Sequence, residues 1–198
     1  DKKILELEKA TKQTELQQLK KQINPHFLFN MLNNANILVK DAPDEASQIL
    51  EKLDNLLRYQ LNDSTRREVF LTADIQFLTS FLELEKVRRD HFEYTIFQEG
   101  NMENICIPPL LFIPFVENAV KHNLDSDNLS YVHLYFSVHN KQLTFRCENS
   151  KPRVPVKREG GIGLANVKRR LDLLYESRYT LQIEDKETTY NVNLHLNL

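Results

Sequence analysis

The hydrophobic rhythm of the chain changes near residue 91, and this change limits the folds that it can adopt. Before that point apolar residues recur every three or four positions, as in the segment 46–61 (ASQILEKLDNLLRYQL), which predicts an amphipathic helix. After it, apolar and polar residues alternate in stretches such as 92–97 (FEYTIF) and 131–138 (YVHLYFSV), which predicts β-strands. We therefore expect an α+β chain, in which a helical hairpin precedes an α/β sandwich with helices on one sheet face.

The hairpin is expected within residues 1–72. Leu16, Leu19 and Ile23 have the spacing of a coiled-coil or bundle seam. Pro25 is expected to kink or restart this first helix, because proline lacks a backbone donor. A single hairpin leaves one apolar face uncovered, so two copies are expected to form a dimeric four-helix bundle.

Residues 73–198 are expected to form the sandwich. Thr72 is a predicted N-cap for the helix that opens it. The predicted helices cover 72–89, 110–123 and 164–175, and the predicted strands cover 92–97, 131–138, 142–147, 180–183 and 190–198, with a turn at 139–140.

Composition narrows the class of protein. With 26 Lys and Arg against 28 Asp and Glu, the chain lacks the basic excess of a nucleic-acid binder. The apolar stretch 105–116 contains three prolines and is shorter than the roughly 18–20 residues of a membrane span. No signal peptide is visible, yet the chain begins at Asp1 without an initiator Met, so we expect a fragment of a longer chain, in which any upstream segment is not visible. Cys106 and Cys147 are expected to be apolar fillers in a reducing compartment.

Three segments carry residues suited to phosphoryl chemistry. In 22–30 (QINPHFLFN), His26 stands beside a proline and one turn before Asn30. A neutral imidazole can accept a phosphoryl group, although a histidine without a role on a helix face is the alternative.

The second segment, 114–123 (PFVENAVKHN), places Glu117, Asn118, Lys121 and His122 on one arc of a helix. An amide oxygen suits a hard cation and the cationic side chains suit phosphate, so this arc fits a Mg-bound polyphosphate. A solvated helix face is the alternative.

The third segment, 160–170 (GGIGLANVKRR), holds three of the four glycines of the chain, Gly160, Gly161 and Gly163. Glycines before a helix allow backbone amides to approach phosphate at the positive end of the helix dipole. The segment is not a Walker A loop, because no Gly-Lys-Ser/Thr follows.

Together QINPHFLFN, IPPLLFIPFVENAVKHN, GGIGLANVKRRLDLLY and the connecting FLELEKVR resemble the LytS-type sensor histidine kinase family over roughly residues 15–198. The resemblance implies a phosphoacceptor hairpin followed by a Bergerat-type (GHKL) ATP-binding domain, and ATP with Mg²⁺ as cofactors. It implies autophosphorylation of His26, transfer to an aspartate of a response regulator, and a homodimer. It also implies the cytoplasmic portion of a bacterial inner-membrane protein, attached through upstream segments.

The resemblance also assigns roles. Asn30 would orient the His26 imidazole, and Asn118 would ligate Mg²⁺. The residues near the nucleotide would be Lys121, His122, Asn123, Asn149, Gly160, Gly161, Gly163, Leu164 and Thr188.

The chain departs from the family pattern at three places. Phe27 follows His26 where many kinases have an acidic residue, so Glu117 is our hypothesis for the base. Asn149 replaces the aspartate that bonds the adenine amino group, and 186–189 (KETT) lacks glycine and carries Glu187. These departures favour an alternative, a degenerate dimeric signalling scaffold with weak or no nucleotide binding.

A metal hydrolase or a DNA-binding module fits the sequence poorly. The six histidines show no HExxH spacing and no pairing with cysteine. The basic run Lys168–Arg170 is expected to be a solvated helix face rather than a reader of DNA.

Overall fold

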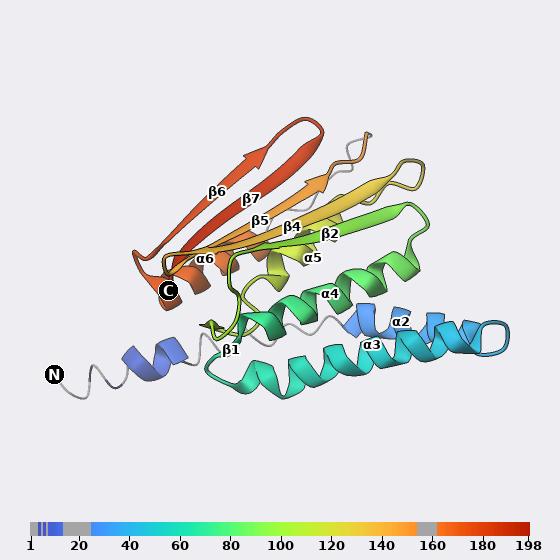
Figure 1. The fold of residues 1–198 in the computed structure, drawn as a ribbon, viewed down its shortest axis with the longest axis horizontal. Helices are drawn as coiled ribbons and strands as arrows, with labels where there is room; N and C mark the ends of the chain where they lie inside the picture. The colour runs from blue at the N-terminus through green and yellow to red at the C-terminus, as the bar shows by residue number, and fades with distance from the viewer. Residues whose placement is uncertain (1–3, 5, 7, 14–24, 154–161) are drawn as a thin grey trace.

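The computed structural model describes residues 4, 6, 8–13, 25–153 and 162–198, and the side chains of Pro25, His26 and Ile162 lie outside the described part. Three layers are stacked in it: a sheet, three helices beneath the sheet, and a helical hairpin beneath those helices (Figure 1). The helices are α2 (Pro25–Leu38), α3 (Pro43–Leu61), α4 (Leu71–Arg88), α5 (Ile113–His122) and α6 (Ile162–Tyr175), with a 3-10 turn η1 (Asp63–Thr65). None of the helices in the described ranges is both long and apolar enough to cross a bilayer.

The main sheet has five strands in the order β2-β4-β5-β7-β6. Its strands are β2 (Phe92–Glu99), β4 (Ser130–His139), β5 (Gln142–Ser150), β6 (Tyr179–Asp185) and β7 (Thr189–Asn197). β2 runs parallel to β4, and every other pair is antiparallel. The predicted strands are therefore confirmed, with ends that differ from the predicted ones by at most three residues. The β4–β5 turn lies at Asn140 and Lys141, both with positive φ, one residue later than predicted.

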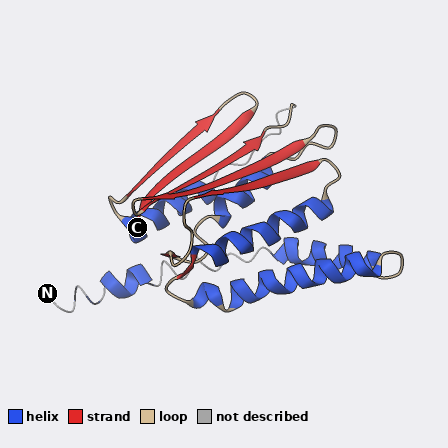
Figure 2. Ribbon diagram, in the orientation of Figure 1, coloured by secondary structure: helices blue, strands red, loops and turns tan. Residues whose placement is uncertain are grey.

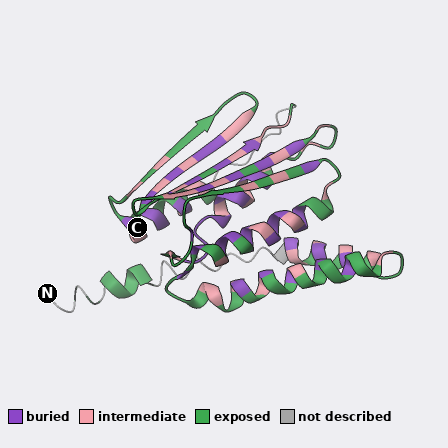
Figure 3. Cartoon of the chain, in the orientation of Figure 1, coloured by how far each residue is buried: buried purple, intermediate pink, exposed green. Residues whose placement is uncertain are grey.

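Helices α4, α5 and α6 cover one face of this sheet, as Figure 2 shows. The alternation seen in the sequence explains the arrangement, because alternate side chains of a strand point to opposite faces. In β4, Val132, Leu134 and Phe136 are buried against the helices, whereas His133 between them is exposed. The purple stripes along the strands in Figure 3 follow this two-residue period.

The hairpin of α2 and α3 packs on α4 and shares its core with the sandwich. The rings of Phe27 and Phe81 stack at 5.0 Å between centroids, and those of Tyr59 and Phe77 at 4.6 Å. Helix α2 begins at Pro25, and the predicted kink or restart there stays a prediction, because residues 14–24 lie outside the described part. The predicted seam residues Leu16, Leu19 and Ile23 lie outside the described residues.

Several local predictions are wrong. Helix α4 begins at Leu71 after Phe70, and no side chain caps it, so Thr72 is not an N-cap. A short pairing of β1 (Val69–Phe70) with β3 (Cys106–Ile107) was not predicted, and it leaves Cys106 exposed while Cys147 is buried.

Helix α5 starts three residues later than predicted. Leu110 has a φ of 57°, which lies in the left-handed region and cannot continue a right-handed helix. The backbone around Leu110 is instead held by side chains from α4 and α6, which are described below.

Candidate nucleotide and phosphoacceptor site

Helix α5 presents the polar arc that the sequence predicted. Its other side is buried through Val116, Ala119 and Val120. Asn118 and His122 are half-buried, and Lys121 is exposed. Basic residues in its last turn also match the negative end of the helix dipole.

Asn123 is a correction to the predicted site. Its side chain is fully buried; its Oδ1 accepts a hydrogen bond from Arg89 Nη1 at 2.9 Å, and its Nδ2 donates to the Tyr131 carbonyl at 3.0 Å. Arg89 also donates to Ser130 Oγ at 2.6 Å and stacks over the Phe92 ring. Asn123 therefore anchors the end of α5 to the sheet and does not face a phosphate.

Glu117 faces the hairpin. It is half-buried and lines a cavity of about 10 Å³, close to the space that one water molecule needs. The cavity is lined from α2, α3, α4 and α5 by Phe27, Leu28, Leu56, Gln60, Phe77, Phe81, Ile113 and Glu117. Burial raises the pKa of Glu117 to about 7, because the charged carboxylate is disfavoured away from water. A carboxyl group poised at this value suits proton transfer near neutral pH.

His26 lies in the first turn of α2, and its side chain is outside the described part. The next residue, Phe27, lines the cavity that Glu117 also lines. Asn30 is half-buried one turn further along α2. The fold therefore brings the backbone of His26 close to the helix that carries Glu117 and Asn118.

Asn149 is buried at the end of β5, in the row that faces the helices. It continues the sequence of buried positions Leu143, Phe145 and Cys147. Its Nδ2 donates to the Ser150 carbonyl at 2.9 Å, which fixes the orientation of the amide. Among the described residues its Oδ1 has no hydrogen-bond partner, so an acceptor remains at the open end of an apolar row.

Thr188 lies beside this end of β5. The Lys151 backbone N–H donates to the Thr188 carbonyl at 2.8 Å, and Ser150 pairs with Thr189 in the sheet. The Thr188 side chain is exposed, as is that of Glu187.

The glycine segment is described only in part. Gly160 and Gly161 lie outside the described residues, whereas Gly163 lies in the first turn of α6. Within the described part of the chain, a Cβ at Gly163 would meet no atom within 4 Å. Leu164 is half-buried and lines a hollow of about 730 Å³ between α6 and β6.

Arg170 is a second correction. Only 4% of it is exposed, and its guanidinium donates to the carbonyl oxygens of Pro109 and Leu110, whereas Lys168 and Arg169 are exposed as predicted. The helical spacing of the sequence could have indicated this burial. Arg170 follows the buried Val167 by three residues and adjoins the buried Leu171, so it lies on the buried side of α6. Asp74, buried on α4, was missed as well.

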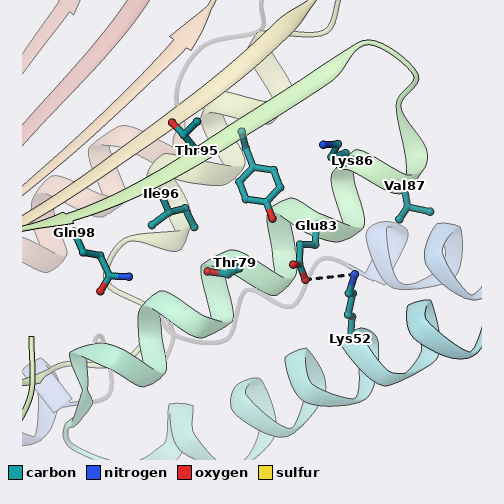
Figure 4. A pocket seen from close by; sticks show the side chains of 9 residues that line it. Lys52, Thr79, Glu83, Lys86, Val87, Thr95, Ile96 and Gln98 are labelled. Atoms are coloured by element: carbon teal, nitrogen blue, oxygen red, sulfur yellow. Dashed lines mark ion pairs between the residues drawn. The ribbon is translucent and has the colours of Figure 1, made fainter. Parts of the chain in front are cut away.

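The hollow in Figure 4 lies elsewhere, between α4, β2 and Lys52 of α3. Its volume is about 790 Å³, and Lys52 pairs with Glu83 across it at 3.5 Å. None of the predicted site residues lines it.

Comparison with known proteins agrees with this arrangement. A family model described as histidine kinase matches residues 14–92. The sensor protein LytS of Staphylococcus haemolyticus is 30% identical over 203 residues, which cover 95% of this chain and 35% of LytS. The chain thus spans about a third of the length of this curated relative.

Solved structures share the fold. The histidine kinase domain of the blue-light-activated kinase of Erythrobacter litoralis aligns with a TM-score of 0.51 at 17% identity, over 96% of this chain and 93% of that one. The histidine kinase ThkA, solved in complex with the response regulator TrrA, aligns with a TM-score of 0.50 at 14% identity, over 98% of this chain and 66% of that one. The expected α+β fold, a helical hairpin joined to a sandwich of the GHKL type, is confirmed. The chain is therefore similar to sensor histidine kinases of the LytS type over nearly all of its length, and its residues 14–92 match the histidine kinase model.

Proposed function

We propose that this chain is the kinase portion of a two-component sensor, which transfers the γ-phosphoryl group of ATP to His26 and then to an aspartate of a response regulator. The observation that carries the proposal is the cavity shared by α2 and α5. It is lined both by Glu117, next to Asn118, and by the residue that follows His26. The donor helix and the acceptor helix are therefore neighbours within one core.

The described residues fit ATP and Mg²⁺. The buried amide of Asn149 offers an acceptor for the adenine amino group at the end of an apolar row. The first turn of α6, where a Cβ at Gly163 would meet no described atom within 4 Å, would take phosphates at the positive end of that helix. Asn118 would supply an oxygen ligand to Mg²⁺, and Lys121 and His122 would face phosphate oxygens. When bound, Mg²⁺ supplies charge neutralisation at the triphosphate.

In the proposed reaction one imidazole nitrogen of His26 attacks the γ-phosphorus, and the bond to the ADP oxygen breaks as the new P–N bond forms. Asn30, one turn away, would hold the ring. The carboxylate of Glu117 would accept the proton of the other ring nitrogen, directly or through a water molecule in the cavity. Its raised pKa makes it a stronger base than an exposed glutamate.

We further propose a homodimer in which two hairpins form a four-helix bundle. Large apolar side chains remain exposed on the outer side of the hairpin even though its inner side is packed on α4: Phe29, Leu32 and Ile37 on α2, and Leu50 and Leu61 on α3. Leu50, Leu57 and Leu61 fall on one stripe of α3. A second copy would cover this stripe.

In the proposed domain organisation, residues 1–72 dimerise and carry the phosphoacceptor histidine, and residues 73–198 bind ATP. The structure of ThkA with its response regulator supports a response regulator as the partner. We propose that the chain is the cytoplasmic portion of a bacterial inner-membrane protein, as the sensor proteins it resembles suggest.

Incubation with γ-labelled ATP and Mg²⁺ tests the kinase proposal. Wild type is expected to acquire acid-labile, alkali-stable label, and His26→Ala is expected to acquire none. His139→Ala is the matched control, because His139 is exposed at the end of β4. Absence of label in wild type, or equal label in His26→Ala, would contradict the proposal.

The second candidate function is a dimeric scaffold with weak or no nucleotide binding. It is favoured by the exposed Glu187 beside Thr188 and by an amide at Asn149, where the pattern of the family it resembles implies an aspartate. Calorimetry with ATP and Mg²⁺ separates the two. Micromolar binding that is lost in Asn118→Asp but kept in Asn197→Asp, an exposed asparagine of β7, would eliminate the scaffold.

A further inference from the structure

A buried chain of polar contacts crosses the molecule from the hairpin to α6. At its centre is Asp74, which is fully buried on α4. The hydroxyl of Tyr59, on α3, donates to Asp74 Oδ1. The same oxygen accepts the Leu110 backbone N–H at 3.3 Å. Asp74 therefore joins the hairpin to the segment that leads into α5.

Arg170 holds the other side of the same segment. Its guanidinium, on α6, donates to the carbonyl oxygens of Pro109 and Leu110. Burial lowers the pKa of Arg170 to about 10, so it remains charged at neutral pH, and Asp74 attracts it. Leu110 is thus fixed through its N–H by α4 and through its carbonyl by α6.

The backbone of Leu110 has a strained conformation, which its hydrogen bonds to Asp74 and Arg170 hold in place. A φ of 57° is unfavourable for an L-residue, and such residues persist where the surroundings over-determine them. Leu110 stands three residues before α5, the helix with Glu117 and Asn118. Arg170 lies two turns after Gly163 in α6. The strained residue is therefore the joint between the two helices assigned to the nucleotide.

We infer that Asp74 and Arg170 are positioning residues that make the placement of α5 and α6 depend on the position of α3, through the path Tyr59–Asp74–Leu110–Arg170. The inference rests on the proposed function and adds to it the route by which the hairpin and the nucleotide site influence each other. A shift of α3 moves the Tyr59 hydroxyl away from Asp74 Oδ1, so the carboxylate that anchors the Leu110 N–H loses its contact with the hairpin. By reciprocity, nucleotide bound at α5 and α6 stabilises α3 near Tyr59.

Hydrogen exchange of the whole chain, with and without a non-hydrolysable ATP analogue and Mg²⁺, tests the path. In wild type the analogue is expected to slow exchange in α6 and also in residues 54–61 of α3. Tyr59→Phe removes one hydroxyl and keeps the ring against Phe77. This variant is expected to keep protection in α6, to lose it in 54–61, and to raise the KM for ATP about three- to tenfold with a smaller change in kcat.

Tyr94→Phe is the matched control. The Tyr94 hydroxyl also bonds to α4, at Glu83, but lies outside the path. Asp74→Asn keeps an oxygen for Tyr59 and Leu110 while it removes the charge that faces Arg170, and it is expected to raise the KM as well. Protection of 54–61 that persists in Tyr59→Phe, or that Tyr94→Phe abolishes equally, would overturn the inference. Protection that follows the expected pattern without any labelling of wild type would contradict the proposed kinase function alone.

Discussion

Glu117 of α5 and Phe27 of α2 line the same small cavity, and Phe27 directly follows the proposed phosphoacceptor. The cavity is thus lined by two segments that are far apart in the chain and that carry different parts of the same proposed reaction. It requires the hairpin to pack on α4 as it does here, with Phe27 stacked on Phe81.

Glu117→Gln is expected to slow labelling of His26 by at least about 100-fold, because general-base assistance contributes on this order. ATP binding is expected to persist, since the substitution keeps the size of the side chain. Rapid-quench labelling measures the rate, and Glu93→Gln, at an exposed position of β2, is the control. Labelling at the wild-type rate would remove Glu117 from the reaction.

The pH profile gives the same assignment a second test. Only the carboxylate form of Glu117 can take a proton, and its pKa is raised to about 7. The wild-type rate is therefore expected to climb as pH rises through 7 and to level off above it. The Gln variant should lack this inflection.

Asn149→Ala is expected to weaken binding of ATP roughly tenfold, because the adenine amino group loses its acceptor. Inosine triphosphate has a carbonyl at that position and no amino group, so its affinity should change much less. Calorimetry with both nucleotides measures the difference. Asn193→Ala, on the opposite sheet face, should alter neither affinity, and an unchanged ratio in Asn149→Ala would contradict the assignment.

The sequence predicted the elements well because their signals are local. Periods of two and of three to four residues located the strands and helices, although β5 runs three residues past its predicted end at Cys147 and so includes Asn149.

The contacts that were missed join residues distant in the chain. Asn123 is hydrogen-bonded to Arg89 and to the Tyr131 carbonyl, and Arg170 is hydrogen-bonded to the carbonyl oxygens of Pro109 and Leu110. The local sequence of either segment does not indicate these partners. Asn123 was therefore predicted to face a ligand, and Arg170 was predicted to face solvent. The β1–β3 pairing was missed because two-residue strands carry no periodic pattern.

The stability of the chain is expected to depend on pH through Asp74. Burial raises its pKa from 3.8 to about 6, so the folded state binds the proton more tightly than the unfolded state does. This contribution to stability is therefore largest below pH 4 and is lost as pH rises through 6, by about 3 kcal/mol. Urea unfolding of wild type and of Asp74→Asn across this range isolates it, since the difference between them should vary with pH. A difference that stays constant would refute the assignment.

Leu50→Glu combined with Leu61→Glu is expected to raise the dimer dissociation constant by on the order of 100-fold or more, because each leucine buried at an interface contributes about 1.5–3 kcal/mol. Analytical ultracentrifugation measures the constant. Ile183→Glu, at an exposed apolar residue of β6, should leave it unchanged. If the variant with Leu50→Glu and Leu61→Glu dimerises like wild type, the leucine stripe of α3 is not the interface.

The most direct test of the central claim is to locate the transferred group. The chain is incubated with ATP and Mg²⁺, digested at alkaline pH, and examined by mass spectrometry that preserves the P–N bond. A phosphoryl group is expected on His26 in the peptide that contains INPHFLFN, at a yield that falls with Glu117→Gln. A phosphoryl group on another residue, or an unmodified His26 in a chain that has bound ATP, would contradict the claim.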